Sequence, residues 1–182
     1  MIDFKTTICI VNDYTGPLKE SMITWVLKHF PQEQIVRATV PKAERNGDGD
    51  CPYLCGRNLA IRDCAIGSGD WTDALFIDND VTPTASTWQF LEGDGDVVAC
   101  RCSMKGHPHA WDHPEDFHNA LWRCKTKVLR AIEPPWFNFI YSDDGCSVLG
   151  CDCLYFAKKV RAAGFTIAHR GRASHDCSRT WS

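Results

Sequence analysis

Residues 73–80 read DALFIDND, an apolar run followed by an acidic segment. Residues 74–77 are wholly apolar, which is typical of a central strand buried on both faces of a sheet. The apolar run ends at Asp78, Asn79 and Asp80. Ligands of open α/β sheets bind beyond the carboxyl ends of the strands. Two carboxylates one residue apart at such a position can face one hard divalent cation, but the same pair also occurs by chance in ordinary turns.

The N-terminal part of the chain predicts a strand, a helix and a second strand. Residues 6–11 (TTICIV) are apolar and rich in β-branched residues, and they lead into turn residues at 12–17. Residues 18–30 repeat as an amphipathic helix, and residues 35–40 predict the second strand. This order implies parallel strands. We therefore expect an α/β fold with a mostly parallel central sheet flanked by helices.

Further elements follow from the same patterns of apolar residues and turn residues. We expect loops at 41–53 and 103–117, helices at 54–66, 82–92, 118–132 and 152–163, and strands at 96–102 and 166–170. For the helix at 82–92, Thr82 is the expected N-cap and Pro83 the first helical residue. Gly164 is expected to take a left-handed C-cap conformation, with Phe165 supplying its hydrophobic contact.

Length, charge and hydropathy limit the classes of protein to consider. A chain of 182 residues suits one domain, and its apolar content is enough for a core. The net charge of -3 argues against general nucleic-acid binding. No segment reaches the roughly 20 apolar residues of a membrane span, and the first residues lack the apolar stretch of a signal peptide. The expected location is therefore the cytoplasm.

The cysteine content is high, with 11 cysteines. The chain has no Cys-x-x-Cys pair, which most zinc ribbons and fingers need, so a structural zinc protein is disfavoured. We expect mainly buried, free thiols. A partial cluster of Cys146, Cys151 and Cys153 stays open, although its spacing matches no set ligand motif.

Three longer stretches resemble GT-A-fold glycosyltransferases. Residues 57–83 (RNLAIRDCAIGSGDWTDALFIDNDVTP) are similar to the central segment of that family, in which a helix precedes the strand that ends in the D-x-D motif. Residues 118–137 (HNALWRCKTKVLRAIEPPWF) and 150–177 (GCDCLYFAKKVRAAGFTIAHRGRASHDC) resemble its second half. There, an acidic residue opens a helix that leads to Gly-Phe, a strand and a final His. The likeness runs from about residue 57 to 177.

The resemblance implies a metal site and a nucleotide site. Asp80 would coordinate the divalent cation, Asp78 would contact the ribose or the water shell of the metal, and His175 matches the family's C-terminal metal-binding His. Carboxylates and an imidazole suit Mn²⁺, with Mg²⁺ as the alternative.

By the same resemblance, Arg57 and Asn58 lie on the helix that faces the nucleotide, and Asn12 and Asp13 end the strand that binds base and ribose. Plain structural roles stay open for each: an exposed helix cation for Arg57 and turn chemistry for Asp13. A single GT-A-like domain over 1–182 is implied, with residues 1–102 as the nucleotide-binding half.

Residues 103–182 would then form the acceptor and catalytic half. Asp152 matches the acidic residue that serves as general base in inverting members, where it takes a proton from the acceptor hydroxyl. Asp143 and Asp144 are weaker alternatives, and an acidic residue at a helix N-terminus is also stabilising without any chemistry. The implied activity is metal-dependent transfer of a sugar from a nucleotide-diphosphate donor, with UDP expected as the nucleotide, to an unknown acceptor hydroxyl.

The chain departs from the family by its short length, and this leaves a homo-oligomer or a partner chain open. Four histidines also lie close together in the sequence: His107, His109, His113 and His118. They could form a second metal site, but we favour a loop that contacts the acceptor or a phosphate. Trp111 and Trp136 could stack on a sugar, with core packing equally open for Trp136. The alternative functions are a nucleotidyltransferase, a nucleotide-sugar hydrolase and a non-catalytic nucleotide-sugar-binding protein.

Overall fold

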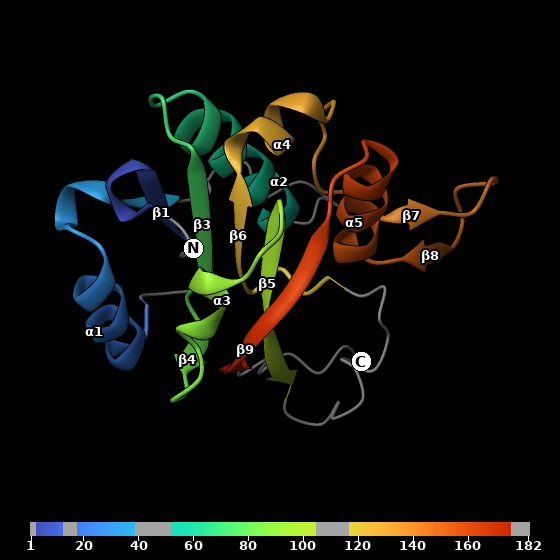
Figure 1. Cartoon of the computed structure of the whole chain (residues 1–182). Helices are drawn as coiled ribbons and strands as arrows, with labels where there is room; N and C mark the ends of the chain where they lie inside the picture. Colours follow the sequence, from blue (N-terminus) through green and yellow to red (C-terminus); the bar gives the residue numbers. More distant parts are fainter. Residues whose placement is uncertain (1–2, 13–17, 39–51, 105–116, 176–182) are drawn as a thin grey trace.

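A computed structural model describes residues 3–12, 18–38, 52–104 and 117–175 of the chain. Its main feature is a seven-stranded sheet with helices on both faces (Figure 1). A two-stranded hairpin projects beside the last helix. No helix in these ranges is long and apolar enough to cross a membrane.

The strands of the main sheet are β1 (Thr7–Asn12), β2 (Ile35–Ala38), β3 (Asp73–Asp78), β4 (Val81–Pro83), β5 (Val97–Met104), β6 (Leu121–Lys125) and β9 (Ile167–His175). The hairpin pairs β7 (Ile140–Tyr141) with β8 (Val148–Gly150). The α-helices are α1 (Glu20–His29), α2 (Pro52–Leu59), α3 (Gln89–Glu92), α4 (Thr126–Ala131) and α5 (Asp152–Ala162). Short 3-10 helices span Phe4–Thr6 and Gln32–Gln34, and a π-helix over Ala60–Ile66 continues α2.

The sheet is mixed, which corrects the expectation of a mostly parallel one. Its order is β2-β1-β3-β6-β5-β9-β4. β1 is parallel to β2 and β3, and β5 is parallel to β9, but β6 runs antiparallel to both of its neighbours and β4 runs antiparallel to β9. The expected β-α-β opening is therefore confirmed. The antiparallel strand β6 could not be foreseen, because the sequence there predicted a helix.

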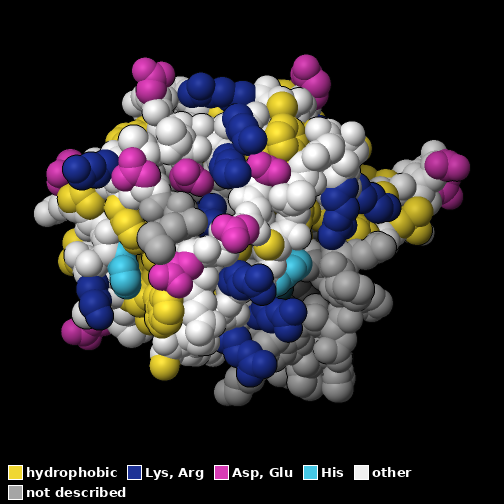
Figure 2. Space-filling view, in the orientation of Figure 1, with side chains coloured by type: hydrophobic (Ala, Val, Ile, Leu, Met, Phe, Trp, Pro, Cys, Tyr) yellow, Lys and Arg dark blue, Asp and Glu magenta, His cyan; other side chains and the backbone are white. Residues whose placement is uncertain are grey.

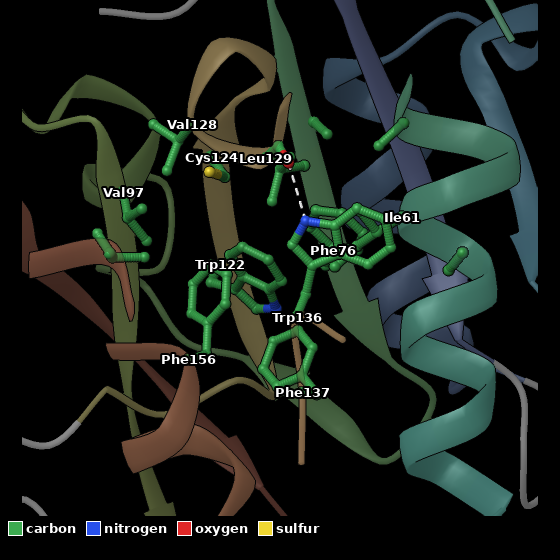
Figure 3. Close-up of a cluster of buried hydrophobic side chains, with 14 of the residues drawn as sticks. Ile61, Phe76, Val97, Trp122, Cys124, Val128, Leu129, Trp136, Phe137 and Phe156 are labelled. Atoms are coloured by element: carbon green, nitrogen blue, oxygen red, sulfur yellow. Dashed lines mark hydrogen bonds between the residues drawn. The ribbon is translucent and has the colours of Figure 1, made fainter. Parts of the chain in front are cut away.

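Two hydrophobic clusters cover the two faces of the sheet. One packs α1 and α3 against the sheet, and the other packs α2, α4 and α5 against the opposite face. In the second cluster Phe76 of β3 stacks on Trp122 of β6 with ring centroids 4.2 Å apart, and Phe156 of α5 packs against Trp122 (Figure 3). Trp136 is buried there and donates its indole N–H to the carbonyl of Leu129 at 2.8 Å. Core packing, rather than sugar stacking, is therefore the role of Trp136.

Residues 118–132 form a strand and a short helix, not the single helix that their spacing predicted. Residues 121–124 are all buried between two strands, and a short apolar run of this kind fits a buried strand as well as a helix. The pairing with β3 and β5 decides between them. The chain turns into helix α4 only at Thr126.

The expected helix at 82–92 is also wrong in its first part. Thr82 and Pro83 belong to strand β4, which pairs with β9, and the helix is confined to Gln89–Glu92. The hydroxyls of Thr84 and Thr87 both donate to the carbonyl of Arg172 in β9. These bonds fix the intervening turn to the sheet.

The last helix ends as predicted. Gly164 has a φ of +80°, and the N–H of Phe165 donates to the carbonyl of Val160 at 3.1 Å. This pairing closes α5 in the way a glycine C-cap does. Strand β9 is longer than the expected 166–170, because it continues beyond a bulge to His175.

The bulge in β9 sets the position of the strand's end. Between the paired positions Ala99/His169 and Arg101/Arg172, β5 advances by two residues and β9 by three, so β9 carries one extra residue. Gly171 lies at this point with a φ of +71°, a conformation that glycine adopts without strain.

Candidate functional site

The site lies where β1 and β3 end. Asn12 and Asp78 are paired in register as the last residues of these two strands. Both side chains are buried, and the amide of Asn12 donates to Oδ1 of Asp78 at 2.9 Å. Parallel strands bring their carboxyl ends to one edge of the sheet, so residues 66 positions apart meet here.

Arg57 connects this edge to helix α5. Its Nη2 donates to Oδ2 of Asp78 at 2.7 Å, and its Nη1 donates to Oδ2 of Asp152 at 2.8 Å. The guanidinium also lies over the ring of Phe137, 5.9 Å from its centroid. Arg57, Asp78 and Asp152 are each at most 10% exposed in their side chains. Charge-assisted bonds at this burial hold the two carboxylates in fixed positions.

Asp80 and His175 form the outer part of the site. The Nε2 of His175 lies 2.9 Å from Oδ1 of Asp80. The antiparallel pairing of β4 with β9 places His175 opposite Val81, the residue that follows Asp80. The histidine side chain is 11% exposed and the aspartate 34%, so the pair lies at the border between interior and solvent.

Asp78, Asp80 and His175 have the arrangement of a metal site. One donor atom from each residue lies within 4.8 Å of the others. Ligand atoms about 2.1 to 2.2 Å from one cation are separated by about 3 to 4.4 Å, so a small adjustment would let all three bind the same ion. Two carboxylates and an imidazole suit Mn²⁺, and the Nδ1 of His175 is buried without a hydrogen-bond partner in the described part of the chain.

The electrostatics of Asp78 also favour a cation. Burial raises the pKa of this carboxyl, and the neighbouring charge of Asp80 raises it further. The charge of Arg57 and the hydrogen bond from Asn12 act in the opposite direction. A divalent cation beside Asp78 would favour its ionised form and offset the repulsion between the two carboxylates.

His118 contacts the same site. Its ring lies edge-on to His175, with the two centroids 5.3 Å apart. Burial lowers the pKa of His118 to about 3, and the positive charges of His175 and Arg57 contribute to this. His118 is therefore neutral at physiological pH. His118 therefore belongs to the Asp80–His175 site. The other three histidines of the expected cluster lie outside the described residues: His107, His109 and His113.

Asn58, on helix α2, is bonded to the backbone of the segment that follows Pro135. Its Nδ2 donates to the carbonyl of Phe137 at 2.9 Å, and its Oδ1 accepts the N–H groups of Trp136 and Phe137 at 2.9 and 3.0 Å. The side chain thus holds the segment after Pro135 against α2. Asp13 and Trp111 lie outside the described residues.

Asn119 is a site residue that the sequence did not reveal. It is buried and donates to Oδ2 of Asp152 at 2.7 Å. Its position directly after His118 and before an apolar run was a possible signal, but the segment predicted a helix. Asp143 and Asp144, the alternatives to Asp152, are exposed in the turn between β7 and β8.

Positive side chains gather over β9 on the face shown in Figure 2. Arg170 and Arg172 of this strand are exposed, and Arg172 is the registered partner of the exposed Arg101 in β5. Like charges on directly paired residues are unfavourable. Arg172 precedes His175 by three residues, a distance of about 10 Å along a strand, and residues three apart point to opposite faces of a sheet.

Comparison with known proteins shows that the fold of this chain is similar to that of a solved structure. No protein-family model matches the chain, and no curated protein sequence matches it. Among solved structures, the chain is similar to A197 from STIV. The TM-score is 0.55 with 15% sequence identity, and the alignment covers 93% of this chain and 81% of that chain. At this identity the similarity shows a common fold over most of both chains and leaves function to be argued from the site itself.

Proposed function

We propose that this chain is a metal-dependent glycosyltransferase that moves a sugar from a nucleoside-diphosphate donor, with UDP as the expected nucleotide, to an acceptor hydroxyl. The observation that carries the proposal is the convergence of Asp78, Asp80 and His175 at the end of β3. Asp78 and Asp80 were singled out from the sequence because they follow an apolar strand, and His175 was found through the resemblance. His175 lies on β9, far from β3 in the chain. A common fold alone would not support this activity, since one fold serves many functions.

The donor would bind at the edge formed by β1 and β3. Mn²⁺ or Mg²⁺ held by Asp78, Asp80 and His175 would neutralise the diphosphate leaving group. The exposed arginines at positions 101, 170 and 172 lie on β5 and β9 and would contribute to a positive field that attracts an anionic donor. Asn12 Oδ1 is buried without a partner in the described part of the chain and is available to a ribose or base donor group.

Asp152 is the proposed general base. Arg57 and Asn119 both donate to its Oδ2, and Oδ1, which Cys153 Sγ approaches at 3.8 Å, is the oxygen that would accept a proton from the acceptor hydroxyl. The two bonds fix the orientation of the carboxylate. Because both terminal nitrogens of Arg57 already donate to carboxylates, we assign Arg57 a positioning role and not that of a phosphate clamp.

Product analysis tests this activity. The full chain is incubated with Mn²⁺ and a panel of nucleotide sugars, and released nucleotides are separated by chromatography. Glycosyl transfer or donor hydrolysis releases nucleoside diphosphate, and we expect Asp80→Asn to reduce this release about 100-fold. Asp94→Asn, at an exposed carboxylate in the turn before β5, is the matched control and should retain activity. Release of pyrophosphate would instead indicate nucleotidyl transfer, and binding without any product would indicate a non-catalytic protein; either result contradicts the proposal.

A further inference from the structure

Two cysteines flank the proposed base at the start of α5. Cys151 is the N-cap of the helix, Asp152 is its first residue and Cys153 follows. Cys151 is exposed and Cys153 is partly buried, and both are free thiols. Their sulfur atoms and a carboxylate oxygen of Asp152 all lie within 4.8 Å of one another.

The two sulfurs can reach bonding distance with little backbone change. Residues two apart in a helical turn have Cα atoms about 5.4 Å apart. Disulfides span Cα separations of about 4.4 to 6.8 Å. Rotation of the two side chains can therefore bring the sulfurs together, although the small ring that closes would restrict the backbone of the residue between them.

The two thiols differ in reactivity. A hydrogen bond from Cys153 lowers the pKa of Cys151 to about 6, assisted by the backbone N–H of Leu154. Most of Cys151 is then thiolate at neutral pH, and the thiolate is the form that reacts with oxidants. The pKa of Cys153 is raised, first by its bond to Cys151 and then by burial. Cys151 thus has the properties of an attacking thiol and Cys153 those of a resolving thiol.

Cys153 is also in contact with the proposed base. Its Sγ lies 3.8 Å from Oδ1 of Asp152, the oxygen that the proposed mechanism uses. Oδ2 of the same carboxylate is held by Arg57 and Asn119. Any movement of Cys153 toward Cys151 therefore changes the surroundings of the working oxygen.

We propose that Cys151 and Cys153 form a peroxide-sensitive dithiol pair whose oxidation to a disulfide inactivates the site. The thiolate of Cys151 attacks one oxygen of hydrogen peroxide; an S–O bond forms, the O–O bond breaks, and the hydroxide that leaves is protonated to water. Cys153 then loses its proton and attacks the Cys151 sulfur, which expels the second oxygen as water. Two thiols are oxidised by two electrons, and one peroxide is reduced to two waters. The formation of the disulfide is independent of the function proposed above, but its effect on catalysis rests on it.

The chemistry is tested by peptide mapping of the full chain after treatment with hydrogen peroxide. Cys146 lies in the same tryptic peptide as the pair, so the experiment uses the Cys146→Ser variant. We expect this peptide to lose about 2 Da, the mass of two hydrogens, and dithiothreitol to restore it. Cys151→Ser or Cys153→Ser, each combined with Cys146→Ser, should abolish the change. Persistence of the change in those variants, or an unmodified peptide at peroxide levels that oxidise other thiols, would overturn the proposal.

A second measurement separates this proposal from the proposed function. Nucleotide-sugar turnover is measured before and after peroxide, with the Cys146→Ser variant as the reference. Reversible loss of turnover that is absent from Cys153→Ser supports control of the site by the pair. A disulfide that forms without loss of turnover contradicts that control. If no variant turns over any donor, the glycosyltransferase proposal fails, while the peptide map still decides whether the dithiol pair exists.

Discussion

The Nη1 of Arg57 lies 2.8 Å from Oδ2 of Asp152, although 95 residues separate them in the sequence. The other terminal nitrogen of Arg57 donates to Asp78. One guanidinium thus joins strand β3, which ends in the candidate metal ligand Asp78, to helix α5, which carries the candidate base. Since all three side chains are buried, this bridge contributes to both the fold and the site.

Removal of the Arg57 bridge should destabilise the protein strongly. Arg57→Met leaves two buried carboxylates without their cation, and we expect the free energy of unfolding to fall by about 3 kcal/mol or more. The measurement is urea denaturation. Arg62→Met, on the adjoining π-helix, removes an exposed arginine paired with Asp63 and should cost less than about 1 kcal/mol. Similar losses in both variants would show that the buried bridge is unimportant.

Gly171 should not tolerate a side chain. A Cβ there would lie 2.6 Å from the carbonyl oxygen of Ser86 and 3.0 Å from that of Thr87. We expect Gly171→Ala to cost about 2 to 4 kcal/mol, because backbone strain adds to the clash. Gly164→Ala is the control: φ is +80° and no described atom lies within 4 Å, so it should cost about 1 kcal/mol. Thermal unfolding of both variants measures the difference, and equal losses would contradict a steric requirement at the bulge.

Asn58 should matter for stability more than for ligand binding. Asn58→Ala removes three hydrogen bonds to the backbone of Trp136 and Phe137, and we expect a loss of about 2 to 3 kcal/mol in urea denaturation. Asn58→Asp keeps the two accepting interactions and should lose less. Affinity for a nucleoside diphosphate with Mn²⁺ should stay within about twofold in Asn58→Asp. A large loss of affinity in a well-folded Asn58→Asp variant would show that Asn58 contributes to nucleotide binding.

Asp96 should make stability depend on pH. Partial burial alone would raise its pKa, but hydrogen bonds from the backbone and hydroxyl of Thr166 and from Lys125 and Lys127 lower it well below the usual value. A carboxyl whose folded-state pKa is lowered stabilises the protein above its unfolded pKa, near pH 4, and this contribution is lost as the pH falls toward the folded-state pKa. We expect Asp96→Asn to cost about 2 kcal/mol at pH 7.

The test for Asp96 is urea denaturation across pH. The difference between wild type and Asp96→Asn should be constant from neutral pH to about pH 5 and should shrink below about pH 4. Asp94→Asn, which removes an exposed carboxylate two positions earlier, should follow the wild-type curve. A wild-type advantage that persists unchanged into acid would rule out the ionised Asp96 as its source.

The sequence predicted the elements whose patterns were unambiguous. Strand β3, helix α5 and its Gly164 cap follow from an apolar run, a 3.6-residue repeat and a C-cap glycine, each a local property. Strand β6 could not be predicted in this way, because residues 121–124 are compatible with two structures and the choice depends on β3 and β5. Strand β4 likewise depends on β9, from the other end of the chain.

The sequence suggested several residues of the candidate site, but it did not show how they are connected. Asp78 and Asp80 follow a buried strand, and His175 and Asp152 were found through the resemblance. The roles of Arg57 as a bridge and Asn119 as a second partner of Asp152 depend on distances between elements, which no local pattern encodes. The bonds of Asn58 to the backbone of Trp136 and Phe137 depend on such distances too.

Manganese binding shows directly whether Asp78, Asp80 and His175 form one metal site. Isothermal titration with Mn²⁺ is carried out with and without uridine diphosphate on wild type, Asp80→Asn, His175→Ala and the control His29→Ala, whose ring packs against Phe4 and Trp25. We predict one site per chain whose affinity rises with uridine diphosphate, falls about 100-fold or more in the Asp80 and His175 variants and is unchanged in His29→Ala. Unaltered Mn²⁺ affinity in folded Asp80→Asn and His175→Ala variants would contradict the account.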